Sequence, residues 1–188
     1  MGEVTRLRDL KVSARDQLML NPTIIKIEKG FNCRDYRLPE NHAHLDFLKE
    51  SIRVNGVRVP LQVRFDVESK EAVLVDGECR LRAVLELIKE GVEIESVPTI
   101  QVPGNNPEQR LVSSVTANTG KPLSKWESGG AFQRLFDFGW DHAKIAASLG
   151  FPERYIREAM ELTDAPEEVK QLLSERAVTP ALALDHLR

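Results

Sequence analysis

Residues 75–83 read VDGECRLRA and come directly after the apolar run at 72–74. This pattern predicts a strand that ends near Asp76 and a helix that begins within one turn of it. Gly77 lets the backbone turn tightly and approach a ligand closely. The free N–H groups at a helix start attract anions, and Arg80 adds a positive charge beside them. Two interpretations stay open here: a tight turn with a charged first helical turn, or a cradle for phosphate.

Strand and helix signals alternate on both sides of this turn. Strands are predicted at 22–28, 60–66, 71–76 and 96–102, and helices at 41–57 and 77–91. Gly56 and Gly91 stand at the expected ends of the two helices. This part of the chain therefore predicts the order β-α-β-β-α-β, which is a compact α+β unit. Residues 1–21 are predicted to form an N-terminal arm or short helix.

From residue 107 onward the strand signals disappear and only helical patterns follow. Ser124, with Glu127 three residues later, predicts a capping box at the start of a helix over 124–140. Gly129 and Gly130 lie inside this helix and should each cost about 1 kcal/mol relative to alanine. The aromatic residues of this region are predicted to form a helical core: Trp126, Phe132, Phe136, Phe138 and Trp140.

The composition of residues 104–106, rich in turn-forming residues, predicts a domain boundary. The expected organisation is an arm at 1–21, an α/β domain at 22–104 and an all-helical domain at 105–188. A helix-turn-helix is expected within the helical domain, at about 141–160.

The sequence HAKIAASLGFPERYIREAM, residues 142–160, carries the helix-turn-helix pattern. Ile145, Ala146 and Leu149 face inward on its first helix, Gly150 makes the turn, and Ile156 and Ala159 anchor the second helix. Residues near the start of the second helix reach base edges in such motifs. The expected DNA-contacting residues are Lys144, Arg154, Tyr155 and Arg157, of which the last three are taken as exposed. An αα-hairpin with solvated charges stays open as an alternative, and Glu153 and Glu158 offset the arginines.

Composition places limits on the function. The 188 residues carry a formal net charge of −3, whereas a protein that binds nucleic acid without specificity is usually basic. Any DNA binding must therefore use a local surface or be switched on by another factor. No apolar stretch is long enough to span a membrane, and the two cysteines, Cys33 and Cys79, form no zinc or disulfide pattern. A cytoplasmic protein, associated with a nucleoid or replicon and without a membrane partner, is expected.

Four motifs in series resemble the ParB partition-protein family over about residues 22–188. They are FNCRDYRLPENHAHLDFLKESIRVNGVRVPLQVR at 31–64, VDGECRLRAV at 75–84, ANTGKPLSKWESGGAFQRL at 117–135, and the helix-turn-helix. In the family the second motif reads GERRxRA and follows the phrase GVxxPLxVR, which appears here as GVRVPLQVR at 56–64. The resemblance implies a fold shared with sulfiredoxin, followed by a helical DNA-binding domain.

The resemblance also implies a nucleotide site. In the family, the first domain binds CTP with Mg²⁺, and the nucleotide closes a DNA-loaded homodimer into a sliding clamp. By position, the implied triphosphate contacts are Arg34, Gly77, Glu78, Cys79 and Arg80, the loop from Gly56 to Pro60 borders the base, and Asn118 lies near the Mg²⁺. Asn32 matches the family glutamine that assists hydrolysis.

The chain departs from the family pattern at three positions. Cys79 replaces the first arginine of GERR, Asn32 replaces the glutamine, and Ala117 replaces a glutamate before Asn118. We therefore expect CTP binding with weak or absent hydrolysis to CDP and phosphate. The expected partners are double-stranded DNA with a specific site, a second copy of the chain and a ParA-type ATPase. Family members usually continue to a C-terminal dimerisation domain, so either the chain is truncated or it dimerises through the parts seen here.

Other functions fit the same sequence. A nuclease or kinase on this fold would need clustered carboxylates, for which the candidates are Asp35, Glu40, Asp76 and Glu78. A nucleotide-independent transcriptional adaptor would keep the cradle only as a relic. Sulfiredoxin-type thiol chemistry is disfavoured, because the family cysteine would fall on Glu78 rather than Cys79. His42 and His44 are expected to be solvated, since no third metal ligand is near them.

Overall fold

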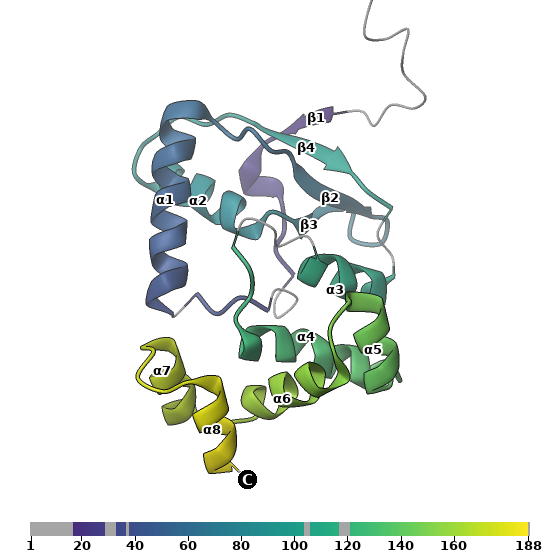
Figure 1. Cartoon of the computed structure of the whole chain (residues 1–188). Helices are drawn as coiled ribbons and strands as arrows, with labels where there is room; N and C mark the ends of the chain where they lie inside the picture. The colour runs from purple at the N-terminus through teal and green to yellow at the C-terminus, as the bar shows by residue number, and fades with distance from the viewer. Residues whose placement is uncertain (1–16, 29–32, 37, 104–105, 117–120, 188) are drawn as a thin grey trace, which may run out of the picture.

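The computed structural model describes residues 17–28, 33–36, 38–103, 106–116 and 121–187. A four-stranded sheet with two helices forms one end of the molecule, and a group of helices forms the other (Figure 1). This arrangement confirms the predicted α+β class. No helix in the described ranges is long and apolar enough to cross a membrane.

The sheet has the strand order β1-β4-β2-β3. Its strands are β1 (Gln17–Leu20), β2 (Leu61–Asp66), β3 (Glu71–Asp76) and β4 (Val97–Gln101). β2 runs parallel to β4, with Leu61 opposite Thr99, and antiparallel to β3. A parallel pair needs a long crossover, and here it runs through β3 and the helix α2 (Glu78–Lys89).

The first strand is not where the sequence predicted it. Strand β1, from Gln17 to Leu20, falls inside the predicted N-terminal arm and pairs antiparallel with β4. The predicted strand at 22–28 is instead a short 3₁₀ turn, Pro22–Ile24, followed by one bridge between Lys26 and Val73. Asn21 explains the difference, because its side chain accepts a hydrogen bond from the Thr23 amide and starts the turn.

Helix α1 (Pro39–Asn55) and helix α2 pack on one face of the sheet. Both helices present apolar residues at helical spacing, and the strands present alternate residues to them. The buried core comprises Ile25, Leu45, Ile52, Leu61, Val63, Leu74, Leu81, Ala83, Val84, Leu87 and Val97. Burying one such leucine or isoleucine contributes roughly 1.5–3 kcal/mol, so this core holds the helices against the sheet.

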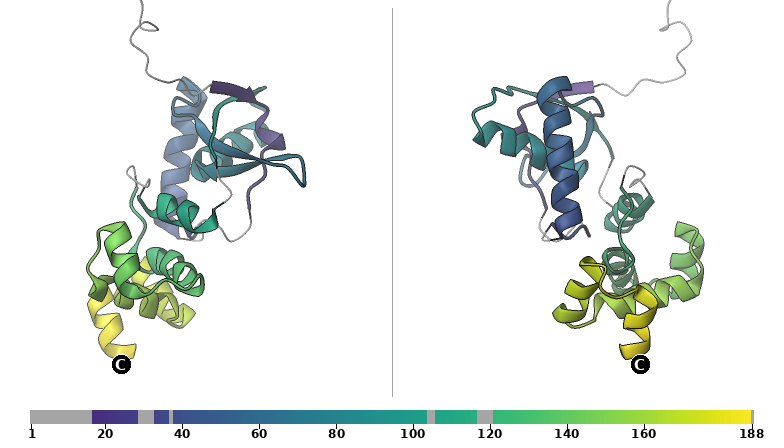
Figure 2. Two further views of the ribbon diagram at one scale, coloured as in Figure 1. Left: turned by 90° about the vertical axis from the view of Figure 1, so that its right-hand side faces the viewer. Right: turned by 60° about the vertical axis from the view of Figure 1, so that its left-hand side comes forward.

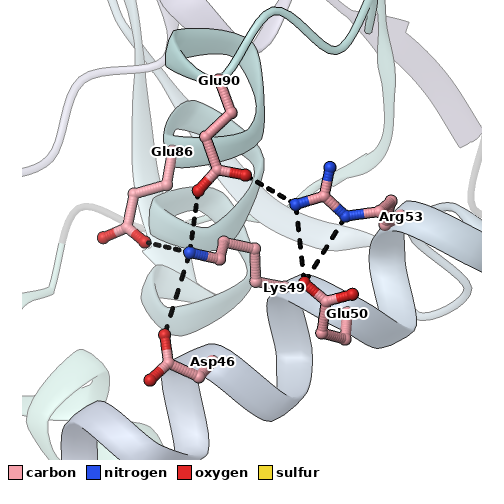
Figure 3. Close-up of polar contacts among 6 residues, drawn as sticks. All are labelled: Asp46, Lys49, Glu50, Arg53, Glu86 and Glu90. Carbon is pink, nitrogen blue, oxygen red and sulfur yellow. Dashed lines mark hydrogen bonds and ion pairs between the residues drawn. The ribbon is translucent and has the colours of Figure 1, made fainter.

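Charged side chains join α1 to α2 on the outside of this core (Figure 3). The ammonium of Lys49 lies 2.9 Å from a carboxylate oxygen of Glu90 and 3.7 Å from Glu86. Arg53 donates to the other Glu90 oxygen at 2.6 Å. Hydrogen bonds from Lys49 and Arg53 lower the pKa of Glu90. Solvent screens this group, so it orients the two helices more than it stabilises them.

From residue 106 onward, the regular elements among the described residues are all helices. They are α3 (Pro107–Thr116), α4 (Lys125–Asp137), α5 (His142–Leu149), α6 (Glu153–Thr163), α7 (Glu167–Ser174) and α8 (Pro180–Leu187). Helices α4 to α8 gather at the end of the molecule opposite β1 (Figure 2). The predicted boundary at 104–106 stays a prediction, since 104 and 105 lie outside the described residues.

The predicted aromatic core is correct only in part. Phe132 is fully buried between α4, α5 and α6, while Trp140 packs against the same cluster and Trp126 against the α7–α8 cluster. Phe136 and Phe138 are 42% and 47% exposed, respectively. Phe136 lies in the last turn of α4 beside the fully buried Leu135, and Phe138 is the C-cap residue. Spacing alone could not show that the buried face of this turn includes Leu135 but not Phe136.

Candidate functional site

The turn from β3 into α2 is as tight as the sequence indicated. Gly77 has φ +100° and stands at the N-cap of α2. A Cβ added there would lie 2.6 Å from Leu61 Cδ2 and 3.1 Å from the Arg80 guanidinium carbon. Two features therefore require glycine at this position: the left-handed backbone conformation and the lack of space for a Cβ atom. Anion binding by the backbone N–H groups at the start of α2 stays a prediction.

Arg80 joins this turn to the loop that precedes β2. Its guanidinium donates to the backbone oxygens of Val59 at 2.6 Å and Pro60 at 2.9 Å. It also forms an ion pair with Asp76 at 2.9 Å. The structure thus brings together Gly77, Arg80 and Pro60, three residues that the sequence assigned to one site. Gly56, with φ +67°, ends α1 at the start of the same loop.

Glu78 and Cys79 both have partners in the first turn of α2. Glu78 forms an ion pair with Arg82 at 2.6 Å, and the Cys79 sulfur lies 3.3 Å from the Tyr36 hydroxyl. Arg82 also covers the Tyr36 ring, with its guanidinium carbon 4.2 Å from the ring centroid. Burial is the largest cause that raises the pKa of Tyr36, and its interaction with the neighbouring Cys79 acts in the same direction. The Tyr36 hydroxyl is thus held against the first turn of α2.

Arg34 is buried, with 7% of its surface exposed, between α1 and the segment that precedes α4. It donates to the Asn41 side-chain oxygen at 3.1 Å and to the Lys121 backbone oxygen at 2.7 Å. Lys121 was not predicted to take part in any site. Asn32 and Asn118, the two residues assigned to hydrolysis and to Mg²⁺, lie outside the described residues.

Glu127 connects this region to the helical half of the chain. One carboxylate oxygen accepts from the Asp35 amide and the Asn41 side-chain amide, each at 2.8 Å. The other accepts from the Ser124 amide at 2.8 Å and its hydroxyl at 2.7 Å. The predicted capping box is thus confirmed. Glu127 also holds the loop before α1, and the local sequence carries no signal for this second role.

Helices α5 and α6 meet at Gly150, which has φ +74°, so the predicted turn is present. Ile145 and Ile156 are fully buried where the two helices pack. On the outer side, the Arg154 side chain is 85% exposed and that of Arg157 is 60% exposed. Each arginine forms an ion pair with a glutamate one turn away on the same helix. Arg154 lies 2.8 Å from Glu158, and Arg157 lies 3.2 Å from Glu153.

The two remaining DNA-contact candidates differ from each other. Lys144 is exposed on α5, and its ammonium lies 4.0 Å from the centroid of the Trp140 ring. Tyr155 was predicted to be exposed, and this is wrong. Its ring stacks on Phe151 at 4.7 Å and meets Phe132 edge-on at 6.3 Å, because the first turn of α6 closes the aromatic cluster. Tyr155 is thus half-buried, and its contact with DNA stays a prediction.

The candidate carboxylates for a nuclease do not gather into a metal-binding cluster with other residues that the structure describes. The structure shows no group of three or more potential metal-ligating side chains among its described residues. Asp76 is paired with Arg80, Glu78 with Arg82, and Glu40 lies 3.7 Å from Arg176. His42 is exposed, while burial, together with Arg34 and Lys121, lowers the pKa of His44.

The chain is similar to nucleoid occlusion proteins of Bacillus. The nucleoid occlusion protein of Bacillus cereus (strain B4264) is 29% identical over 138 residues, covering 73% of this chain and 46% of that protein. The protein of the same name from Bacillus thuringiensis (strain Al Hakam) is 28% identical over 138 residues, with the same coverage. The chain thus spans about half the length of these relatives. A scan against protein-family models finds no match.

Two solved structures have a similar fold. One is the C-terminally truncated partitioning protein ParB of Caulobacter crescentus, complexed to the centromeric parS site. It is 20% identical with a TM-score of 0.57, over 88% of this chain and 82% of that chain. The other is a Pnob8-like ParB-N domain, which is 15% identical with a TM-score of 0.57. That comparison covers 90% of this chain and 78% of the other.

Proposed function

We propose, from the premise that this chain is ParB-like in its fold, that it binds a specific site on double-stranded DNA through α5 and α6. We further propose that it binds CTP with Mg²⁺ at the start of α2, and that the nucleotide controls closure of a homodimer around DNA. A role in DNA partition or transcription regulation, with a ParA-type ATPase as a possible partner for the partition role, belongs to the same proposal.

The observation that carries the DNA proposal is the placement of Arg154 and Arg157. Both project from the first turns of α6, the second helix of the pair, where such helices read base edges in the major groove. Lys144 adds an exposed positive charge on α5. The ion pairs of these arginines with Glu158 and Glu153 must break before the arginines contact DNA. This cost favours specific base contacts over general attraction to phosphate.

The nucleotide proposal rests on the family resemblance and is supported by the turn at Gly77. The turn brings the helix start, Arg80 and the Pro60 loop together, as a phosphate cradle with a neighbouring base pocket requires. Cys79 cannot supply the cation of the family arginine, so stabilisation of the charge that develops during hydrolysis is weaker. We therefore propose that the chain binds CTP and hydrolyses it slowly or not at all.

A second candidate function is a DNA-binding adaptor that needs no nucleotide. One observation favours it: the Arg80 guanidinium is already engaged by Asp76 and by two backbone oxygens of the neighbouring loop. An arginine that serves only to hold this loop would give the same contacts. The nucleotide experiment below separates the two candidates.

The DNA site can be tested by replacing each arginine of α6 singly. A randomised duplex pool would be enriched on the full chain, and the affinity for the enriched sequence measured by fluorescence anisotropy. Arg154→Ala and Arg157→Ala should each weaken binding roughly tenfold, as expected for lost base contacts. Arg176→Ala removes an equally exposed cation between α7 and α8 and should change affinity less than about twofold. Unchanged affinity in both α6 variants would mean that α6 is not the recognition helix.

The nucleotide site can be tested by calorimetric titration with CTP, ATP, GTP and UTP in the presence of Mg²⁺. CTP alone should give heat, and Arg80→Ala should reduce the affinity about tenfold or more because a charge-assisted bond to phosphate is lost. Lys89→Ala, which removes an exposed cation at the other end of α2, is the matched control and should leave the affinity unchanged. If none of the four nucleotides gives binding heat, with or without the enriched DNA, the nucleotide-independent adaptor is the function that remains.

A further inference from the structure

The carboxylate of Glu158 on α6 lies between two cations that come from different helices. Arg154, one turn earlier on α6, donates from Nε to one carboxylate oxygen at 2.8 Å. Lys125, the first residue of α4, donates from its ammonium to the other oxygen at 2.5 Å. Each oxygen thus bonds to one of the two cations, so the bond to Arg154 can break while the bond to Lys125 stays.

The two arginines of α6 differ in the surroundings of their partners. The side chain of Glu158 is only 13% exposed, whereas that of Glu153, the partner of Arg157, is 46% exposed. Water can solvate Glu153 as soon as Arg157 leaves it. A carboxylate as shielded as Glu158 is costly to leave without a partner, because it has lost much of its hydration. The release of Arg154 to DNA therefore depends on what else bonds to Glu158.

Lys125 is held in place independently of Arg154. Its side chain is 18% exposed, and its ammonium lies 4.9 Å from the centroid of the Tyr155 ring, which is itself stacked on Phe151. The hydrogen bond from Lys125 is the largest of the causes that lower the pKa of Glu158 to about 2, and the hydrogen bond from Arg154 follows. The Glu158 carboxylate thus stays ionised at neutral pH and keeps a charged partner when Arg154 leaves.

We infer that Lys125 is a positioning residue for DNA recognition, which keeps Glu158 neutralised while Arg154 turns from Glu158 to a base edge. This inference deepens the proposed DNA function and rests on it. The ligand is double-stranded DNA that presents hydrogen-bond acceptors in the major groove, which are the groups that an arginine reads. Lys125 acts through Glu158 and Arg154 and needs no DNA contact of its own, so its removal should matter only while Glu158 is charged.

The inference is tested with the full chain and the enriched duplex, by fluorescence anisotropy. Lys125→Gln should weaken binding about fivefold, because Arg154 is then the one cation still bonded to Glu158 among the described residues and its release costs more. Lys125→Arg, which keeps the charge, should stay within about twofold of the wild type. Lys170→Gln, which removes a cation from α7, is the matched control and should change the affinity less than about twofold.

A rescue experiment separates this role from other roles of Lys125. In the Glu158→Gln background, Lys125→Gln should change the affinity less than about twofold, since a neutral amide holds Arg154 far less strongly than a carboxylate does. Adding Arg154→Ala to this double variant should again weaken binding about tenfold, because the recovered affinity passes through Arg154. Thermal denaturation confirms that each variant is folded at the temperature of the titration.

The outcomes separate this inference from the proposed function. Equal affinity of Lys125→Gln and the wild type overturns the inference and leaves the DNA proposal intact. A loss that Glu158→Gln does not recover also overturns it. A salt dependence reduced by about one phosphate contact would then identify Lys125 as a direct DNA contact, and an unchanged one would identify a role in the fold. If Arg154→Ala has no effect while Arg157→Ala weakens binding, only the inference fails. If neither variant has an effect, the inference and the DNA proposal fail together.

Discussion

Replacing Gly129 by alanine is expected to destabilise the protein by about 3 kcal/mol, because the added methyl group has no room. A Cβ at this position would overlap the backbone oxygen of Ala159 and the hydroxyl of Thr163. Helices α4 and α6 cross here, and the Thr163 hydroxyl donates across the crossing to the Trp126 oxygen at 2.6 Å. Since α6 carries Arg154 and Arg157, DNA affinity should fall together with stability.

Gly130 provides a matched control for this prediction. It is the next residue of the same helix, and the nearest atom to a Cβ added there is 4.0 Å away. Gly130→Ala should therefore stabilise the protein by about 0.5–1 kcal/mol, which is the usual gain in helix propensity. Thermal denaturation of both variants distinguishes them, with a melting temperature about 10 °C lower for Gly129→Ala. Equal effects of the two substitutions would show that α4 and α6 do not cross closely at Gly129.

Replacing Glu127 by alanine is expected to destabilise the protein by about 4 kcal/mol. Only 4% of Glu127 is exposed, and its carboxylate accepts from four donors. Alanine would leave the buried donors of Asp35, Asn41 and Ser124 without an acceptor, and each such group costs about 1–3 kcal/mol. Glu127→Gln should cost about half as much, because its one oxygen can serve either the cap or the loop, but not both.

Two further variants locate the origin of the effect. Ser124→Ala removes part of the cap alone and should cost about 1 kcal/mol. Glu168→Ala removes an exposed carboxylate from the first turn of α7 and should change stability by less than about 0.5 kcal/mol. Urea denaturation measures all four free energies of unfolding. A Glu127→Ala variant no less stable than Ser124→Ala would contradict the link between α4 and the loop before α1.

Glu127 also shows how the two proposed sites can be connected. Glu127 takes part in the N-terminal cap of α4, which packs against α6. Its carboxylate also accepts a hydrogen bond from the amide of Asp35, the residue after Arg34. A ligand that moves Arg34 or Lys121 would act on Asn41, which both of them contact and which donates to Glu127. Glu127→Gln therefore offers a variant in which DNA affinity and nucleotide affinity can be measured separately and together.

Much of the local structure could be predicted from the sequence, because local forces determine it. Helix α2 and its start at Gly77 follow from periodicity and from the conformational freedom of one glycine. The cap at Ser124 and the turn at Gly150 follow from residues three or four positions apart. The first strand was misplaced because β1 is short and exposed and takes its position from pairing with β4, some eighty residues away.

In the candidate site, too, some features follow from the local sequence and others only from tertiary contacts. The sequence by itself determined that Gly77 and Arg80 lie at a helix start and that Arg154 and Arg157 lie on the outer side of α6. Only the tertiary structure placed Lys121 beside Asn41 and Glu127 beside Asp35, across sequence separations of 80 and 92 residues. It also decided that Gly129 must be glycine, because α6 passes over it, and that Tyr155 packs inward. Periodicity describes one helix at a time, whereas buried polar partners and helix crossings depend on how distant segments meet.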